Sequence, residues 1–322
     1  MNQSYNPILI GIIAGLATAL LMAASGYAPF ASLFLLSASL GAIFLAGLGS
    51  GLVASLVAIA VAAIANALLY SSPESLVFTA VPLLPASVMA YLANLARPAE
   101  EIGGPDSATA WFPLSDILLI GAVLTAIATV ITISVHADME KIYEAVAEAA
   151  IRMAQDMSPE MPIAADMQAQ MKGILKSLWP LIQSAQMMVA LFAGYYMASR
   201  ILSATGRNMR PREDMPTSLR MNRVSILVFL LGLALMFAGG PIGLAGSSFA
   251  GATAAGFLLA GFAIIHRFLR EKPWGTPTLI IIYLLTLLMP IFGIAIILAG
   301  GLANPRRAIA LTPNKAPTAN DN

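Results

Sequence analysis

Residues 1–25 read MNQSYNPILIGIIAGLATALLMAAS and contain one long apolar run. From Ile8 to Ala24 it carries no charged residue. At ~1.5 Å of rise per residue, a helix of this length crosses most of the roughly 30 Å hydrocarbon core of a bilayer. No Lys or Arg precedes the apolar run, and further apolar runs follow closely. The stretch therefore predicts a retained first membrane helix rather than a cleaved signal peptide.

Composition extends this prediction to the whole chain. Hydrophobic residues make up 59% of the sequence, charged residues 10%, and the mean hydropathy is +0.83, which is typical of a polytopic membrane protein. A formal net charge of +1 argues against nucleic acid as a partner, because that binding needs a concentrated basic surface. The chain contains no cysteine, which excludes disulfides, thiolate metal sites and cysteine nucleophiles.

Apolar runs of about 20 residues predict an all-α, polytopic transmembrane helical bundle with about nine spans, or eight if one run does not cross. A membrane β-barrel is excluded because the runs are long and do not alternate. The candidate spans are residues 8–24, 30–48, 51–69, 76–95, 115–135, 179–203, 224–240, 247–269 and 278–302.

Four regions follow from these runs. Residues 1–135 form an N-terminal bundle of five spans, and residues 179–303 form a C-terminal bundle of four. Between them lies a charged insert, residues 136–178. The Pro/Asn/Thr-rich tail, residues 304–322, has too few apolar residues to order itself.

Arginines set the expected orientation in a bacterial inner membrane. The connection after residue 203 carries Arg207, Arg210, Arg212, Arg220 and Arg223, which predicts a cytoplasmic loop. Alternation of the spans then places the N-terminus in the cytoplasm. The same alternation places Arg306 and Arg307 outside, against the positive-inside rule. Either this pair is tolerated there or one run is re-entrant, and Pro290 makes the last run suspect.

The insert is amphipathic. Ile142, Val146, Met153 and Met157 recur at helical spacing, opposite an acidic stripe of Glu residues. A second helical pattern follows after Pro159 and Pro162, so an extracytoplasmic helical hairpin is expected. Its flexible Met face suits a lid or a docking element for a partner. The alternative is a hairpin that only packs on the bundle or lies at the interface.

Two pairs of polar residues are candidate ligand contacts. Gln183 and Gln186 lie one turn apart within an apolar span, where an amide binds a ligand or a neighbouring helix. His266 and Arg270 lie at i and i+4 at the end of another span and can hold an anion at the membrane rim. The alternative for this second pair is an anchor to lipid headgroups.

Catalytic motifs are missing from the sequence. It has no phosphate-binding Gly-rich loop ending in Lys and Ser/Thr, no HExxH and no GxSxG. Only two His are present, without metal-ligand spacing. The expectation is a protein that is not an enzyme and has no cofactor and no bound metal.

Small residues form a stripe on the first helix, at Gly11, Gly15, Ala19 and Ala23, and allow close packing of another helix. Together with the C-terminal motifs GFAIIHRFLREKPWGTP and GGLANPRR, the chain resembles the YybS-like family of uncharacterised bacterial integral membrane proteins. That family is distantly similar to the substrate-binding S components of energy-coupling factor vitamin transporters. The resemblance implies that the stripe contacts a membrane coupling subunit. S components have six spans and no counterpart of the insert.

Two functions are therefore expected. The first is the substrate-binding membrane component of a small-molecule, vitamin-like transporter that depends on a coupling subunit. The second is a non-catalytic structural or scaffolding protein of the cell envelope, because the spans have almost no ionisable residue at their centres, which pumps usually need.

Overall fold

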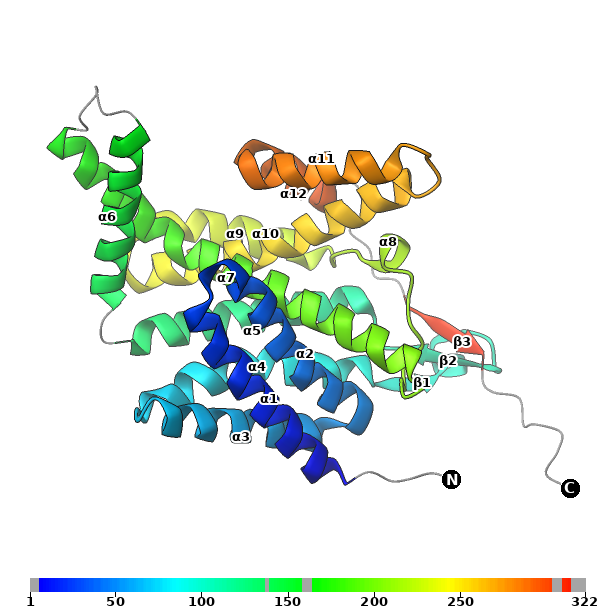
Figure 1. Ribbon diagram of the computed structural model, residues 1–322. Helices are drawn as coiled ribbons and strands as arrows, with labels where there is room; N and C mark the ends of the chain where they lie inside the picture. Colours follow the sequence, from blue (N-terminus) through cyan, green and yellow to red (C-terminus); the bar gives the residue numbers. More distant parts are fainter. Residues whose placement is uncertain (1–5, 137–138, 158–163, 303–308, 314–322) are drawn as a thin grey trace, which may run out of the picture.

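The computed structural model describes residues 6–136, 139–157, 164–302 and 309–313, and these form a helical bundle with a small sheet at one end (Figure 1). The α-helices are α1 (Pro7–Tyr27), α2 (Ser32–Ser50), α3 (Leu52–Leu69), α4 (Glu74–Ala93), α5 (Leu114–Val135), α6 (Met139–Met157), α7 (Ala165–Ala204), α8 (Met215–Ser218), α9 (Val224–Leu235), α10 (Gly240–Leu269), α11 (Gly275–Leu288) and α12 (Pro290–Leu302). The strands are β1 (Ala96–Pro98), β2 (Ala108–Trp111) and β3 (Leu311–Pro313), and the short 3-10 turns are η1 (Pro29–Ala31), η2 (Ala99–Ile102) and η3 (Met236–Ala238).

Seven of these helices, α1 to α5, α7 and α10, are long and apolar enough to cross a membrane. This confirms the all-α, polytopic fold. The remaining apolar helical segments in the described part of the chain are the shorter Val224–Ala238 and the pair α11–α12, which bends by 114° at its break.

The bundle has two ends, which we call the hairpin face and the loop face. The hairpin face carries α6 and the first turns of α7, and the loop face carries residues 205–223 and the sheet (Figure 1). At the hairpin face, Ser247 of α10 donates to the carbonyl of Ser177 at 3.1 Å. At the loop face, Arg270, just after α10, binds Asp214 at 3.0 Å.

The predicted amphipathic hairpin is present. Ala147 and Ile151 of α6 are buried, and the rings of Tyr143 and Trp179 lie edge to face with centroids 6.3 Å apart. The second arm is not a separate helix, because α7 runs without a break through 40 residues, about 60 Å at the usual rise. The expected boundary between residues 178 and 179 therefore falls inside α7. Pro159 and Pro162 lie outside the described residues.

The last predicted span is the bent pair α11–α12. Pro290 has no amide hydrogen to continue the helix, so the chain changes direction there. The pair begins after Arg270 on the loop face, and β3, which follows it, lies on the same face because it pairs with β2. The chain therefore leaves the loop face and returns to it. With the shorter α9 carrying the chain back to the hairpin face before α10, this path is consistent with eight crossings, the lower of the two counts that the sequence allowed.

The segment after α12 is described only from Ile309 to Pro313. Arg306 and Arg307 themselves lie outside the described residues. The strand that follows them is antiparallel to β2, and the indole nitrogen of Trp111 donates to the Thr312 hydroxyl at 2.9 Å. The C-terminal strand thus lies at the same end of the bundle as the Arg-rich loop and the first turn of α1 (Figure 1).

Small residues allow the helices to approach one another closely. A Cβ added to Gly11 would lie 2.7 Å from the Ala54 carbonyl, and one added to Gly15 would lie 2.6 Å from the Ala58 carbonyl. Ala19 and Ala23 on the same stripe are buried. The stripe therefore packs on α3 of its own chain. It is not available to a coupling subunit in this conformation, in contrast to what the resemblance to S components implies.

We expect Gly15→Ala to lower the free energy of unfolding in detergent by about 1–3 kcal/mol, because the added methyl forces α1 and α3 apart. Gly26→Ala in the same helix is the matched control, since nothing lies within 4 Å of its Cβ position. Chemical unfolding in mixed micelles measures both variants. Equal stability of the two variants would contradict the observed α1–α3 packing.

Candidate functional site

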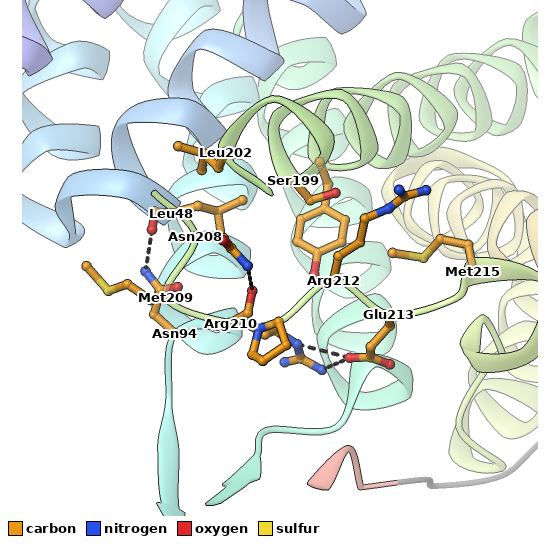
Figure 2. Close-up of a pocket in the computed structure, with 12 residues that line it drawn as sticks. Leu48, Asn94, Ser199, Leu202, Asn208, Met209, Arg210, Arg212, Glu213 and Met215 are labelled. Carbon is orange, nitrogen blue, oxygen red and sulfur yellow. Dashed lines mark hydrogen bonds and ion pairs between the residues drawn. The ribbon is translucent and has the colours of Figure 1, made fainter. Parts of the chain in front are cut away.

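The loop face is organised around one buried arginine, Arg210, which is 7% exposed (Figure 2). Its Nε donates to Oε1 of Glu213 at 3.0 Å, and a second guanidinium nitrogen contacts the same oxygen. Its Nη1 donates to the main-chain carbonyl of Phe112 at 2.7 Å and to that of Ala93 at 3.4 Å. This one side chain therefore fastens the loop to the end of α4 and to the segment before α5.

Two amides reinforce this fastening. Asn94 Nδ2 donates to the carbonyls of Gly47 and Leu48 at 3.1 and 3.2 Å and so joins the end of α4 to the last turn of α2. Asn222 Nδ2 donates to Asp116 Oδ1 at 2.6 Å and joins the far end of the loop to α5. The loop between α7 and α9 is therefore held by two of its own side chains, Arg210 on the carbonyls of Ala93 and Phe112 and Asn222 on Asp116.

The cavity beside Arg210 is small. It lies between Leu48, Asn94, Tyr195 and the loop residues (Figure 2). The volume open to a water-sized molecule is only about 20 Å³. That volume fits about one water molecule. A vitamin-sized ligand needs several hundred Å³. The Arg210 region is therefore a structural clamp.

A second, open hollow lies between α8 and the C-terminal end of α10, and we call it the basic basin. It offers about 670 Å³, which is within the range of small-ligand sites. It is lined by Thr217, Arg220, Ile264, Arg267, Phe268, Arg270, Glu271 and Lys272. Four cations thus line the wall, against one carboxylate.

Hydrogen bonds fix two of these cations. Arg270 Nη1 donates to both carboxylate oxygens of Asp214, at 3.1 and 3.0 Å, and so joins the end of α10 to the residue before α8. Arg220 is 3% exposed, and its Nη1 donates to the carbonyls of Leu219 at 2.6 Å and Pro216 at 3.4 Å. These contacts hold the positive charges in place without an added ligand.

The predicted pair His266 and Arg270 does not converge on one ligand. The Nδ1 of His266 lies 2.9 Å from the Phe262 carbonyl, and its Nε2 lies 3.4 Å from the hydroxyl of Tyr283 on α11. Arg270 instead lies in the basin, against Asp214. His266 therefore belongs to the α10–α11 contact, and only Arg270 belongs to the basin.

The side chains of the predicted pair Gln183 and Gln186 also lie in different environments. The Oε1 of Gln183 is buried and has no hydrogen-bond partner among the described residues, whereas the side chain of Gln186 is exposed on the outside of the bundle. Neither amide lines the Arg210 cavity or the basin. Their role as ligand contacts stays a prediction.

The sequence did not indicate the Arg210–Glu213 pair, and of the basin residues it indicated Arg270 as an anion contact, paired with His266. The Arg-rich loop was a visible signal, but every arginine in it counted equally as a marker of orientation. The spacing of Arg210 and Glu213 by three residues was the one local sign of a pair. The contribution of Arg220 to the basin depends on how α8 packs on α10, which a hydropathy pattern does not contain.

Comparison with known proteins places the chain in a family. Residues 16–303 match the family described as "Predicted membrane protein (DUF2232)". The chain belongs to this family. No curated protein and no solved structure matches it. The family and the seven long apolar helices together establish a multi-pass membrane protein in contact with the lipid bilayer.

Loss of the clamp is expected to destabilise the bundle. Arg210→Ala leaves the Glu213 carboxylate and two main-chain carbonyls without their buried donor, which costs about 3 kcal/mol. Arg212→Ala removes an exposed arginine from the same loop and should stay within about 0.5 kcal/mol of the parent chain. Unfolding of the purified protein in detergent measures both. A stable Arg210→Ala protein would show that the loop is held by other contacts.

Proposed function

We propose that this member of the family is a non-catalytic docking protein of the bacterial inner membrane. The observation that carries the proposal is the continuity of α7, which is one helix from the protruding hairpin to the loop face. A partner that binds the hairpin therefore contacts a helix that continues into the bundle. This corresponds to the structural or scaffolding function expected from the sequence.

The surface of the hairpin supports a docking role. A hollow on α6 of about 600 Å³ is lined by Ala145, Glu148, Ala149, Arg152, Met153, Asp156 and Met157. Met153 is 67% exposed, and Met side chains adapt to apolar partners. The partner that fits is a helix of another envelope protein, with an apolar face that covers Met153 and Met157 and a basic residue beside Asp156.

Orientation is part of the same proposal. The loop face carries Arg207, Arg212 and Arg223 in addition to the buried arginines, and cationic loops stay in the cytoplasm. The hairpin then lies on the extracytoplasmic side, and α1 begins in the cytoplasm. Envelope proteins on that side are the candidate partners.

A second candidate is the substrate-binding component of a small-molecule transporter, as the resemblance to YybS-like proteins and S components implies. One observation favours it: the Oε1 of Gln183 is buried without a partner among the described residues, and a bound ligand would supply the missing donor. The small-residue stripe no longer supports this candidate, because α3 covers it. A coupling subunit would have to bind elsewhere.

Photocrosslinking in living cells tests the docking proposal. A photoreactive amino acid at Met153 should form a discrete protein adduct, and the same amino acid at Met209, an exposed Met of the loop face, should not form that adduct. Asp156→Lys should weaken the Met153 adduct severalfold, because it places a like charge against the basic residue of the partner. Immunoblotting measures the amount of the adduct, and mass spectrometry identifies the crosslinked partner.

The transporter candidate predicts a different outcome. A metabolite would then copurify with the protein, Gln183→Leu would remove it, and Asp156→Lys would leave it bound. Identical adducts at Met153 and Met209, or no adduct at either position, would count against docking through the hairpin.

A further inference from the structure

The basic basin stands apart from the hairpin and from the proposed docking role. Its four cations, Arg220, Arg267, Arg270 and Lys272, come from the segment after α8 and from the end of α10. The whole chain has a formal net charge of only +1. The basin is therefore a local concentration of positive charge and does not reflect a basic protein.

The basin contains too few carboxylates to neutralise these charges. Glu271 is the one acidic residue in its lining, and Asp214, at its edge, already binds Arg270. Arg267 and Arg270 are three residues apart on one helix, where like charges repel. The negative end of the α10 dipole offsets part of this repulsion. An anion in the basin would offset the rest.

We infer that the basic basin binds the phosphate of an anionic phospholipid. Guanidinium groups bind phosphate oxygens through paired hydrogen bonds, and two arginines with a lysine beside them supply several donors for one phosphate. The volume of about 670 Å³ admits a headgroup. A zwitterionic headgroup fits less well, because its ammonium group would meet the same cations.

The depth of the basin in the bilayer favours a lipid as the source of the phosphate. At ~1.5 Å per residue, the 30 residues of α10 extend about 45 Å, longer than a hydrocarbon core of about 30 Å. The last turn of α10 thus lies at headgroup level. Two exposed aromatic side chains mark the same level: Phe268 in the basin wall is 68% exposed, and Trp274 is 51% exposed.

A surface for the acyl chains continues from the basin. The bent pair begins at Gly275, directly after the basin, and the outward side of α11 is apolar and exposed. The exposed residues are Ile280, Ile281, Leu284, Leu287 and Leu288. Phosphate in the basin and chains along α11 together describe a phospholipid, whereas a soluble phosphate would use only the basin.

Native mass spectrometry of the full-length protein tests the assignment. Phosphatidylglycerol and phosphatidylcholine are titrated onto the parent chain and onto Arg267→Ala/Lys272→Ala, which keeps the Arg270–Asp214 contact. We expect phosphatidylglycerol to bind the parent chain better than phosphatidylcholine. We expect the double variant to lose at least tenfold in phosphatidylglycerol affinity, because each cation near the surface contributes about fivefold.

The control removes two other arginines from the loop face, Arg97→Ala/Arg200→Ala, both exposed and outside the basin. It should keep the parental preference. An equal loss in the control would overturn the inference, because charge on the whole face would then be sufficient. Equal binding of both lipids by the parent chain would overturn it as well.

Soluble phosphates distinguish a lipid headgroup from a free phosphate as the ligand of the basin. Inorganic phosphate and glycerol 3-phosphate should neither raise the thermal unfolding midpoint nor displace phosphatidylglycerol at millimolar concentration. Displacement by either would assign the basin to a soluble phosphate and overturn the lipid assignment. Arg267→Gln/Lys272→Gln removes both charges but keeps polar side chains, and it repeats the test if the alanine variant does not fold. Undiminished lipid binding by that variant would also overturn the inference.

Discussion

Every main-chain N–H and C=O group inside a bilayer must find its partner within the protein, and this constraint shapes the rest of the structure. It makes each apolar run a helix, so the helices must then associate without a hydrophobic force between them. Close contact over small residues supplies that association. A Cβ on Gly15 would meet the Ala58 carbonyl at 2.6 Å, and one on Gly194 would meet the Ser37 carbonyl at 2.9 Å. The bundle is held together where side chains are smallest.

The same constraint decides what happens where helices end. The end of α2 obtains donors from Asn94, and the carbonyls of Ala93 and Phe112 obtain theirs from Arg210. The buried charge of Arg210 is balanced by Glu213. The loop face is thus a set of polar groups that satisfy one another beside the membrane, and its remaining cations, at the end of α10, line an open basin. The hairpin face is simpler, because α7 continues out of the bundle without a break.

Hydropathy predicted the helices well because the length of an apolar run is a direct requirement of the bilayer. It did not predict which helix covers which: the stripe at Gly11 and Gly15 predicted close packing of some helix, the resemblance implied a coupling subunit, and in the structure α3 packs on it. It left eight or nine spans open because of Pro290, and the path after the bend shows that the chain turns back there. The three short strands were not predicted, because β2 and β3 are about 200 residues apart and too short to show the alternation of a strand. The basin was not predicted for a related reason. Its charged residues are visible in the sequence, but whether they line one hollow depends on tertiary packing.

Side-specific labelling tests whether the pair α11–α12 returns the chain to the loop face. The chain has no cysteine, so one introduced thiol reports alone. Thr205→Cys, Ile309→Cys and Met153→Cys place that thiol at exposed positions of the loop face, the C-terminal segment and the hairpin. In sealed vesicles of known orientation, an impermeant maleimide should label positions 205 and 309 from the same side and position 153 from the opposite side. Labelling of position 309 from the side that labels position 153 would contradict the account, because the last pair of helices would then cross the membrane.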